Sequence, residues 1–205
     1  FLTHGDEFIQ NGYYFDPFSN AANAQIGDLV GTMINGSDLS MCFSVLCPTN
    51  NSTSFFGSLN DGALAFGRLD GQSFAVNSFD ASFLGASGLQ LPPVSGLLRL
   101  QGFTSSGATL TQTFQLAGPN AAGVLGFGSY QTSGTFASTQ FSTVYAFGFA
   151  CNAGGTCNAF STDRAQFALD NISVSAVPEA ETSAMFALGL IALGAAVRRR
   201  RQQSV

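Results

Sequence analysis

The sequence predicts an all-β protein built as a single β-sandwich of the jelly-roll type, followed by one C-terminal hydrophobic helix. Three observations support this. Strand-like alternation recurs along residues 1–176, while helical periodicity is weak. Turn pairs such as Asn11-Gly12 and Asp70-Gly71 separate the alternating segments. The 21 phenylalanines are enough to fill a core, and only 9% of residues are charged, which argues against disorder. No repeat of fixed period is visible, so a solenoid or propeller is not expected.

The individual strands follow from the alternation of side chains along the chain. The extended segments, in chain order, are Leu64–Leu69, Phe74–Phe79, Leu98–Gln101, Ala108–Leu116, Val144–Phe149 and Phe167–Val174. Residues 20–54 are rich in loop-forming residues and leave room for a short helix. Residues 174–182 read as a linker to the C-terminal segment. We therefore expect one domain over residues 1–176 and a separate tail over residues 177–205.

The tail combines a short motif, a short apolar helix and a basic end. Val177, Pro178 and Glu179 open the motif at residues 177–182, and an uncharged run from Ala184 to Val197 follows it. With Ser183 added, residues 183–197 are the predicted transmembrane helix. The 14 residues of the run span roughly 21 Å, which is short against a hydrocarbon core of about 30 Å. The stop-transfer cluster consists of Arg198, Arg199, Arg200 and Arg201.

This order of parts resembles the PEP-CTERM sorting signal of Gram-negative bacteria. The resemblance implies that Pro178 and Glu179 are recognised, that the helix enters the inner membrane, and that the protease exosortase processes the tail. Ala180 stands where the family usually has proline. By the positive-inside rule the arginines stay cytoplasmic, so the body lies outside the inner membrane. The expected course is export, a tethered intermediate, and then the cell surface or the extracellular space.

The charge of the body limits its partners. Residues 1–176 hold ten acidic side chains against three arginines, a net charge of −7. Because nucleic-acid binding depends on neutralising phosphates, an acidic body is not expected to bind nucleic acid. It is more compatible with neutral polymers or divalent cations. The numbering begins at Phe1, so we infer that a signal peptide was removed or omitted.

Four cysteines fall into two local pairs, Cys42 with Cys47 and Cys151 with Cys157. Pairing across each short loop is the simplest connectivity for an exported protein. The alternative is a zinc site of four thiolates, but zinc ligands favour tighter spacing. We therefore predict two local disulfides.

The body also resembles a subgroup that carries the same tail and has no established activity. The resemblance lies in residues 157–174, with Gln166-Phe167 and Asp170 shortly before the sorting motif. A final strand of this kind is also common in extracellular jelly rolls that bind carbohydrate, where a structural Ca²⁺ often joins the first and last strands. A calcium site using Glu7 (or its neighbour Asp6) and Asp170 is therefore a candidate. The alternative is solvated terminal acids, with Asp170 capping a turn or pairing with Arg164.

Carbohydrate binding is the second candidate, because exposed aromatic rings stack on sugars. Tyr13, Tyr14, Tyr130 and Tyr145 are the candidate rings. Tryptophan is absent, and most aromatic side chains of the chain are expected in the core or half-buried in a sheet. Catalysis is not expected, since His4 is the single histidine and no Gly-x-Ser-x-Gly elbow occurs.

Two classes of function follow from these expectations. In the first, the chain is a non-enzymatic surface or matrix protein. The family resemblance implies this class, because exosortase systems accompany exopolysaccharide production and biofilm formation. In the second, the body is a carbohydrate-binding module, assisted by Ca²⁺.

The tail generates a test of its own. Protein recovered from its native host should have an intact mass that lacks the apolar helix and the four arginines. A mature protein that retains the full tail would instead identify a plain membrane anchor.

Overall fold

The computed structural model describes residues 1–42, 45–86, 88, 90–161 and 163–176. The chain divides into two compact units, Phe1–Ser175 and Ala176–Val205. The predicted sorting motif, transmembrane helix and arginine cluster lie outside the described residues. Within the described part, no helix has the length and apolar character needed to cross a membrane.

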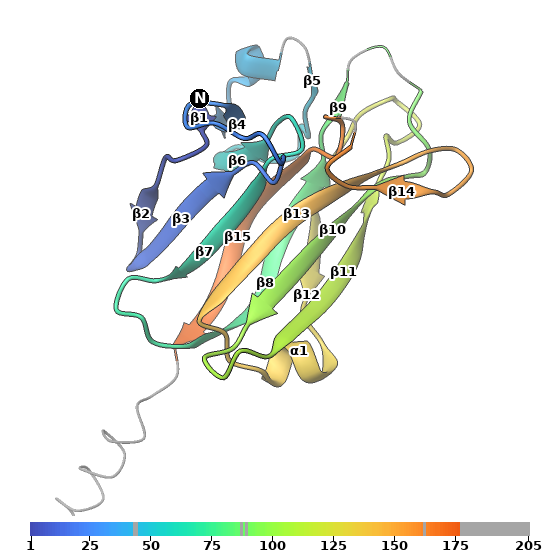
Figure 1. Ribbon diagram of the computed structural model, residues 1–205. Coiled ribbons are helices and arrows are strands. Elements are labelled where there is room, and N and C mark those ends of the chain that lie inside the picture. Colours follow the sequence, from blue (N-terminus) through green and yellow to red (C-terminus); the bar gives the residue numbers. More distant parts are fainter. Residues whose placement is uncertain (43–44, 87, 89, 162, 177–205) are drawn as a thin grey trace, which may run out of the picture. The chain divides into compact units, whose positions relative to one another are not determined.

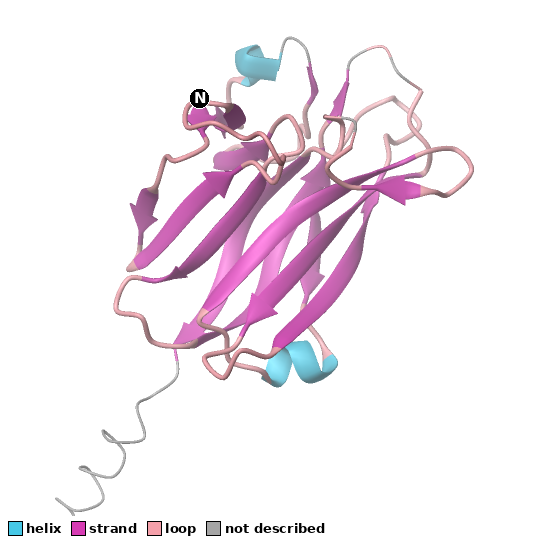
Figure 2. Cartoon of the chain, viewed as in Figure 1, coloured by secondary structure: helices cyan, strands magenta, loops and turns pink. Residues whose placement is uncertain are grey.

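Two sheets form the first unit (Figures 1 and 2). Sheet A contains, in spatial order, β1 (Leu2–Thr3), β4 (Leu29–Asn35), β6 (Ser54–Ser58), β15 (Phe167–Ala176), β8 (Phe74–Phe83) and β12 (Gly128–Gln131). Sheet B contains β11 (Thr109–Ala117), β10 (Val94–Phe103), β13 (Thr143–Cys151), β7 (Ala63–Arg68), β3 (Tyr13–Phe18) and β2 (Phe8–Gln10). The smaller elements are β5 (Val45–Leu46) paired with β9 (Gly85–Ala86), β14 (Cys157–Asn158) paired with β13, the 3-10 turn η1 (Leu39–Cys42) and α1 (Gly134–Ser138).

The two sheets pack face to face, which confirms the predicted β-sandwich. Their shared core is rich in phenylalanine, and Phe66, Phe74 and Phe167 are fully buried in it. Leucines at the predicted positions Leu98, Leu100 and Leu116 complete the same cluster. Burying apolar side chains on the inner face of each strand is the main stabilising term for such a fold.

The inward side chains of β13 are small. Val144 and Ala146 are fully buried, and Gly148 faces the core beside them. A Cβ added at Gly148 would lie 2.3 Å from the carbonyl oxygen of Ala165, so no larger residue fits. Since strand side chains alternate with a period of two, Tyr145, Phe147 and Phe149 therefore point to the outer face of sheet B.

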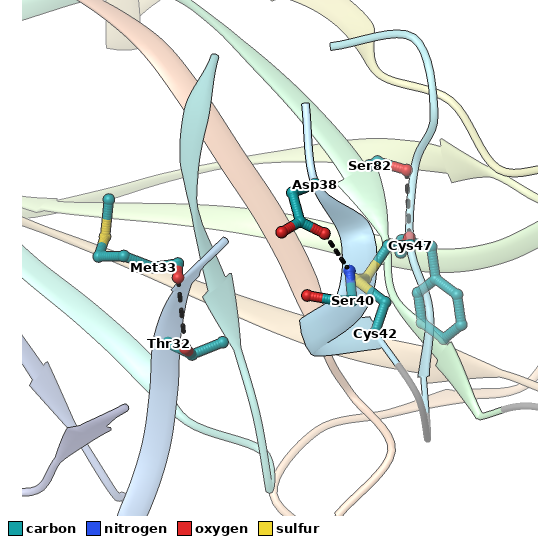
Figure 3. Close-up of a disulfide and its surroundings, with 8 residues drawn as sticks. Thr32, Met33, Asp38, Ser40, Cys42, Cys47 and Ser82 are labelled. Carbon is teal, nitrogen blue, oxygen red and sulfur yellow. Dashed lines mark hydrogen bonds between the residues drawn. A yellow bond between two sulfur atoms is a disulfide. The ribbon is translucent and has the colours of Figure 1, made fainter. Parts of the chain in front are cut away.

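The segment before β6 is more regular than expected from residues 20–54, because it contains β4. The predicted short helix is the 3-10 turn η1, where the backbone NH of Ser40 donates to Asp38 Oδ1 at 3.0 Å (Figure 3). This segment covers a second small core on the outer side of sheet A. Its buried members are Ile34, Cys47, Phe55, Leu84 and Ala168.

Both predicted disulfides are present. Cys42 pairs with Cys47 at a Cα–Cα distance of 6.0 Å, and Cys151 pairs with Cys157 at 4.0 Å. The second disulfide closes the hairpin between β13 and β14, where the two cysteines are also direct cross-strand partners. Disulfides of this kind are typical of exported proteins.

A buried carboxylate fixes the start of β15. Asp61, in the turn between β6 and β7, is 6% exposed. Its Oδ1 accepts a hydrogen bond from the backbone NH of Ala165 at 2.6 Å, and its Oδ2 accepts one from Asp163 at 2.9 Å. Asp61 also has a φ of 53°, a left-handed conformation that Asp and Asn tolerate.

Asp61→Ala should therefore lower the free energy of unfolding by about 2–3 kcal/mol, since it removes charge-assisted hydrogen bonds to a buried backbone. Asp61→Asn still tolerates the left-handed backbone conformation and keeps one acceptor oxygen. The decrease in the free energy of unfolding should therefore be smaller for this variant. Chemical denaturation of both variants checks this. An alanine variant as stable as the wild type would show that the segment before β15 is held by other contacts.

Candidate functional site

The outer face of sheet B carries two groups of contacting aromatic rings. In Figure 1 the sheet containing β13 and β10 lies in front of β8 and β15. Phe18 of β3 contacts Tyr145 of β13 with ring centroids 5.2 Å apart, and Phe103 of β10 contacts the other side of Tyr145 at 4.9 Å. Further along β13, Phe147 and Phe149 lie 5.7 Å apart. All of these rings are half-buried, so each still exposes part of its surface to solvent.

The rings reach one another because the strand between β3 and β13 has small outward side chains. Ala63 and Ala65 of β7 are directly opposite Phe147 and Tyr145 in the register. At the next position a Cβ on Gly67 would lie 2.7 Å from the ring of Tyr14. The phenol of Tyr14 thus lies across β7 and hydrogen-bonds Thr143 Oγ1 of β13 at 3.0 Å. The result is one aromatic surface extending across three strands.

Polar side chains are set among these rings. Asp16 lies between Tyr14 and Phe18 on β3, and Gln101 lies directly opposite Tyr145 on β10. No hydrogen bond to either side chain occurs among the described residues. Arg99, opposite Phe147, has its guanidinium carbon 4.7 Å from the ring centroid of Phe149 and donates from Nε to Thr113 at 3.0 Å. We call Tyr14, Asp16, Phe18, Arg99, Gln101, Tyr145, Phe147 and Phe149 the aromatic face.

Asp16 is the most unusual member of the aromatic face. Burial raises the pKa of its carboxyl above the ordinary value of 3.8. The charge of nearby His4 opposes this shift, and that of Glu7 adds to it. A half-buried carboxylate without a hydrogen-bonding partner in the described structure can accept hydrogen bonds from a ligand.

The outer face of sheet A is different, because its polar groups satisfy one another. Asp170 Oδ2 accepts hydrogen bonds from Asn51 at 2.7 Å and Thr53 at 2.8 Å. Asn171 donates to Asp80 at 2.8 Å, and Ser129 donates to the same carboxylate at 2.6 Å. These side chains tie β15 to its neighbours and leave fewer groups available for a ligand.

The described residues do not form a set of ligands for the candidate calcium site. Glu7 is exposed just before β2 of sheet B, whereas Asp170 belongs to β15 of sheet A. No group of three or more His, Cys, Asp or Glu side chains suited to a metal occurs in the described part of the chain. Asp170 bonds Asn51 and Thr53 rather than Arg164. The alternative reading, in which Asp170 has a structural role, fits these contacts.

The four candidate tyrosines divide between the two faces of their strands. Tyr14 and Tyr145 belong to the aromatic face. Tyr13 packs edge-on against Phe74 at 5.4 Å, and Tyr130 stacks on Phe79 at 5.5 Å. Tyr13 and Tyr130 are half-buried and pack against the core, as expected for most aromatic side chains of the chain, so they do not belong to the outer face of sheet B. His4 accepts a hydrogen bond at Nδ1 from the backbone of Ser19 at 3.3 Å.

Sequence reasoning did not find Asp16, Gln101 or Phe147 as site residues. A usable signal existed for Asp16, since a single acid alternates with aromatic residues in Tyr14, Asp16 and Phe18. For Phe147 the signal was ambiguous, because both sets of alternating residues in β13 are apolar.

No protein-family model matches the sequence, and no curated protein matches it. Among solved structures, the chain is similar to TmCBM61, a carbohydrate-binding module solved in complex with β-1,4-galactotriose. The identity is 5% and the TM-score 0.38, over 80% of this chain and 88% of that one. It is similar to the Family 16 Carbohydrate Binding Module-2 at 9% identity and TM-score 0.31, over 71% and 85%.

A third similarity is to the enzymatically active domain of tailspike protein 4 of bacteriophage CBA120. The identity is 10% and the TM-score 0.34, over 82% of this chain but 20% of that one. Similarities at these levels define no family, so a function has to be argued from the residues of this chain.

The environment of Asp16 predicts a pH-dependent stability. An acid whose pKa is raised on folding binds its proton more tightly in the folded state, so stability is lost as pH rises through the folded pKa. Asp16→Asn should therefore raise the unfolding temperature near pH 7, and this gain should shrink near pH 3, where Asp16 is mostly protonated.

Asp70→Asn is the matched control with the opposite sign. The Arg68 guanidinium lowers the pKa of Asp70 to about 2, so the loss of this carboxylate should lower stability near pH 7. Thermal unfolding of both variants across pH makes the comparison. An Asp16→Asn variant no more stable than the wild type near neutral pH would contradict the raised pKa of Asp16.

Proposed function

We propose that this chain is an exported, non-enzymatic protein of the cell surface or extracellular matrix whose aromatic face binds a neutral polysaccharide. The observation that carries the proposal is the combination of half-buried rings with Asp16 and Gln101, whose side chains have no hydrogen-bonding partner among the described residues. The apolar side of a sugar ring stacks on an aromatic ring, while its hydroxyls need hydrogen-bonding groups beside that ring. The aromatic face supplies both on one surface.

The geometry favours an extended chain over a single sugar. Tyr145, Phe147 and Phe149 follow one another at every second residue of β13, so their Cα atoms are about 6.8 Å apart along the strand. On the antiparallel neighbour β10, Gln101 lies opposite Tyr145 and Arg99 lies opposite Phe147. A polymer lying along β13 would meet repeated rings on one side and repeated hydrogen-bonding groups on the other.

Charge supports a neutral ligand. Residues 1–176 carry a net charge of −7, and Asp16 lies within the aromatic face itself. An anionic polymer would be repelled by both, whereas hydroxyl groups would satisfy the Asp16 carboxylate without bringing further charge. Export through the sorting tail and processing by exosortase are part of the same proposal, since they would deliver the body to an extracellular polysaccharide layer.

Affinity electrophoresis of the full chain in mild detergent, through gels containing soluble β-1,4-galactan, β-1,4-glucan or β-1,4-mannan, tests the proposal. At least one polymer should retard the wild type. Tyr145→Ala should weaken that retardation about tenfold or more, because a central stacking ring is worth about 1–3 kcal/mol. Tyr145→Phe keeps the ring and should retain most of the affinity.

Met33→Ala is the matched control. Met33 is a 44% exposed apolar side chain on β4 of sheet A, outside the aromatic face. Its loss should leave retardation unchanged. The absence of retardation by any polymer would leave a purely structural matrix role, and equal effects of the Tyr145 and Met33 variants would remove the aromatic face as the site.

A further inference from the structure

A separate cavity lies beside the disulfide hairpin that ends β13. It has a volume of about 450 Å³, within the range of about 300–1,000 Å³ that is usual for small-molecule sites. Its apolar wall comes from Phe83, Leu91, Pro92 and Ala150. Phe83 and Ala150 face the interior between the sheets, so this cavity is distinct from the aromatic face on the outside of sheet B.

Polar side chains from three segments surround the apolar wall. Gln90 comes from the segment before β10, Asn158 from β14, and Asp163 and Arg164 from the segment before β15. The cavity therefore offers strong donors and a strong acceptor around a hydrophobic surface. This is the arrangement that orients a small polar ligand.

Arg164 stands out among the arginines of the body. Arg68 pairs with Asp70, and Arg99 contacts Phe149 and Thr113. For Arg164, by contrast, no hydrogen bond or ion pair occurs within the described residues. Gln90 and Asn158 likewise have side chains without a hydrogen-bonding partner in that part of the chain. These three lining side chains are exposed, so their hydrogen-bonding groups are open to water or to a ligand.

The walls of the cavity are held in place before any ligand arrives. Cys151 and Cys157 join the two strands of the hairpin both by their disulfide and by strand pairing, and Asn158 is paired with Ala150. In the segment before β15, Asp61 binds the backbone NH groups of Asp163 and Ala165 on either side of Arg164. Fixed walls reduce the entropy lost on binding.

We infer that this cavity is a second binding site, which holds a neutral mono- or disaccharide or the terminal sugar of a neutral polysaccharide. The apolar wall fits the hydrophobic side of a sugar ring. The guanidinium of Arg164 donates to sugar oxygens, and the Asp163 carboxylate accepts from hydroxyls. With one positive and one negative side chain the site has no excess charge, and the acidic body disfavours an anion. The site goes beyond the proposed function, because it recognises a short ligand independently of the aromatic face.

Isothermal titration calorimetry of the full chain in mild detergent tests the inference. The probes are cellobiose, β-1,4-galactobiose and β-1,4-mannobiose, with digalacturonate as the anionic comparison. At least one neutral disaccharide should bind. Arg164→Ala should weaken that binding about tenfold or more, as expected for a lost hydrogen bond to a charged group. Asn158→Ala, in the disulfide hairpin, should weaken it by a smaller factor.

Arg68→Ala removes the same charge outside the cavity and should leave disaccharide binding unchanged. Tyr145→Ala should also leave it unchanged, while Arg164→Ala should leave retardation by polysaccharide gels intact. The Tyr145 and Arg164 variants therefore show separately whether the cavity binds disaccharide and whether the aromatic face binds polysaccharide. Each disaccharide is also compared with its long polymer, which has few chain ends. A site that recognises only the terminal sugar should bind far less polymer than disaccharide at equal mass.

Three results would overturn the inference. The first is no binding of any neutral disaccharide. The second is binding that Arg164→Ala does not weaken or that Tyr145→Ala abolishes. The third is binding of digalacturonate in preference to every neutral probe.

Discussion

The structure depends on complementary volumes across the sandwich. Large rings fill the space between the sheets, and β10 and β13 carry glycine at the inward positions that these rings or the nearby backbone approach most closely. A Cβ at Gly96 would lie 2.5 Å from the ring of Phe83, and one at Gly102 would lie 2.3 Å from the ring of Phe141. Gly148 is equally closed by the backbone of Ala165. Any larger residue at these positions would push the sheets apart.

This packing constraint also creates the aromatic face. Because side chains alternate along a strand, a register that places Gly148 inside necessarily places Phe147 and Phe149 outside. The same holds on β10, where Gly102 faces the core and Gln101 and Phe103 face outward. The outward position of these aromatic side chains is thus a consequence of how the core is filled. Sheet A shows the contrast, since its outer polar groups bond one another and hold the sheet together.

The sequence was sufficient for the β-sandwich and for both disulfides, because alternation, glycine turns and cysteine spacing are local signals. It was not sufficient for β4, where Gly31 interrupts a short strand between turn-forming residues. It also could not decide which residues of β13 face the core, since Val144 and Phe147 are both apolar. Only the packing of Phe167 and Ala165 against Gly148 decides this.

Only part of the candidate site was predicted, because the sequence does not show which face of a strand each aromatic residue occupies. Tyr14 and Tyr145 were named as sugar-binding candidates, but so were Tyr13 and Tyr130, which point inward. Neighbouring residues of a strand face opposite sides, so Tyr13 and Tyr14 cannot both be exposed in the same way. Asp16 could have been found from its place among alternating aromatic residues. The cavity beside Arg164 could not, because it brings together segments around Gln90, Asn158 and Arg164 that are far apart in the chain.

The central claim is that the outer face of sheet B is the surface that meets polysaccharide. Amide chemical-shift mapping by NMR, during titration with a soluble oligosaccharide of a polymer that retards the chain, tests this most directly. If this surface binds the oligosaccharide, the largest shifts should fall on β3, β10 and β13, around Asp16, Gln101 and Tyr145. Shifts concentrated instead around Asp80 and Asp170 on sheet A, or no localised shifts at saturating ligand, would contradict it.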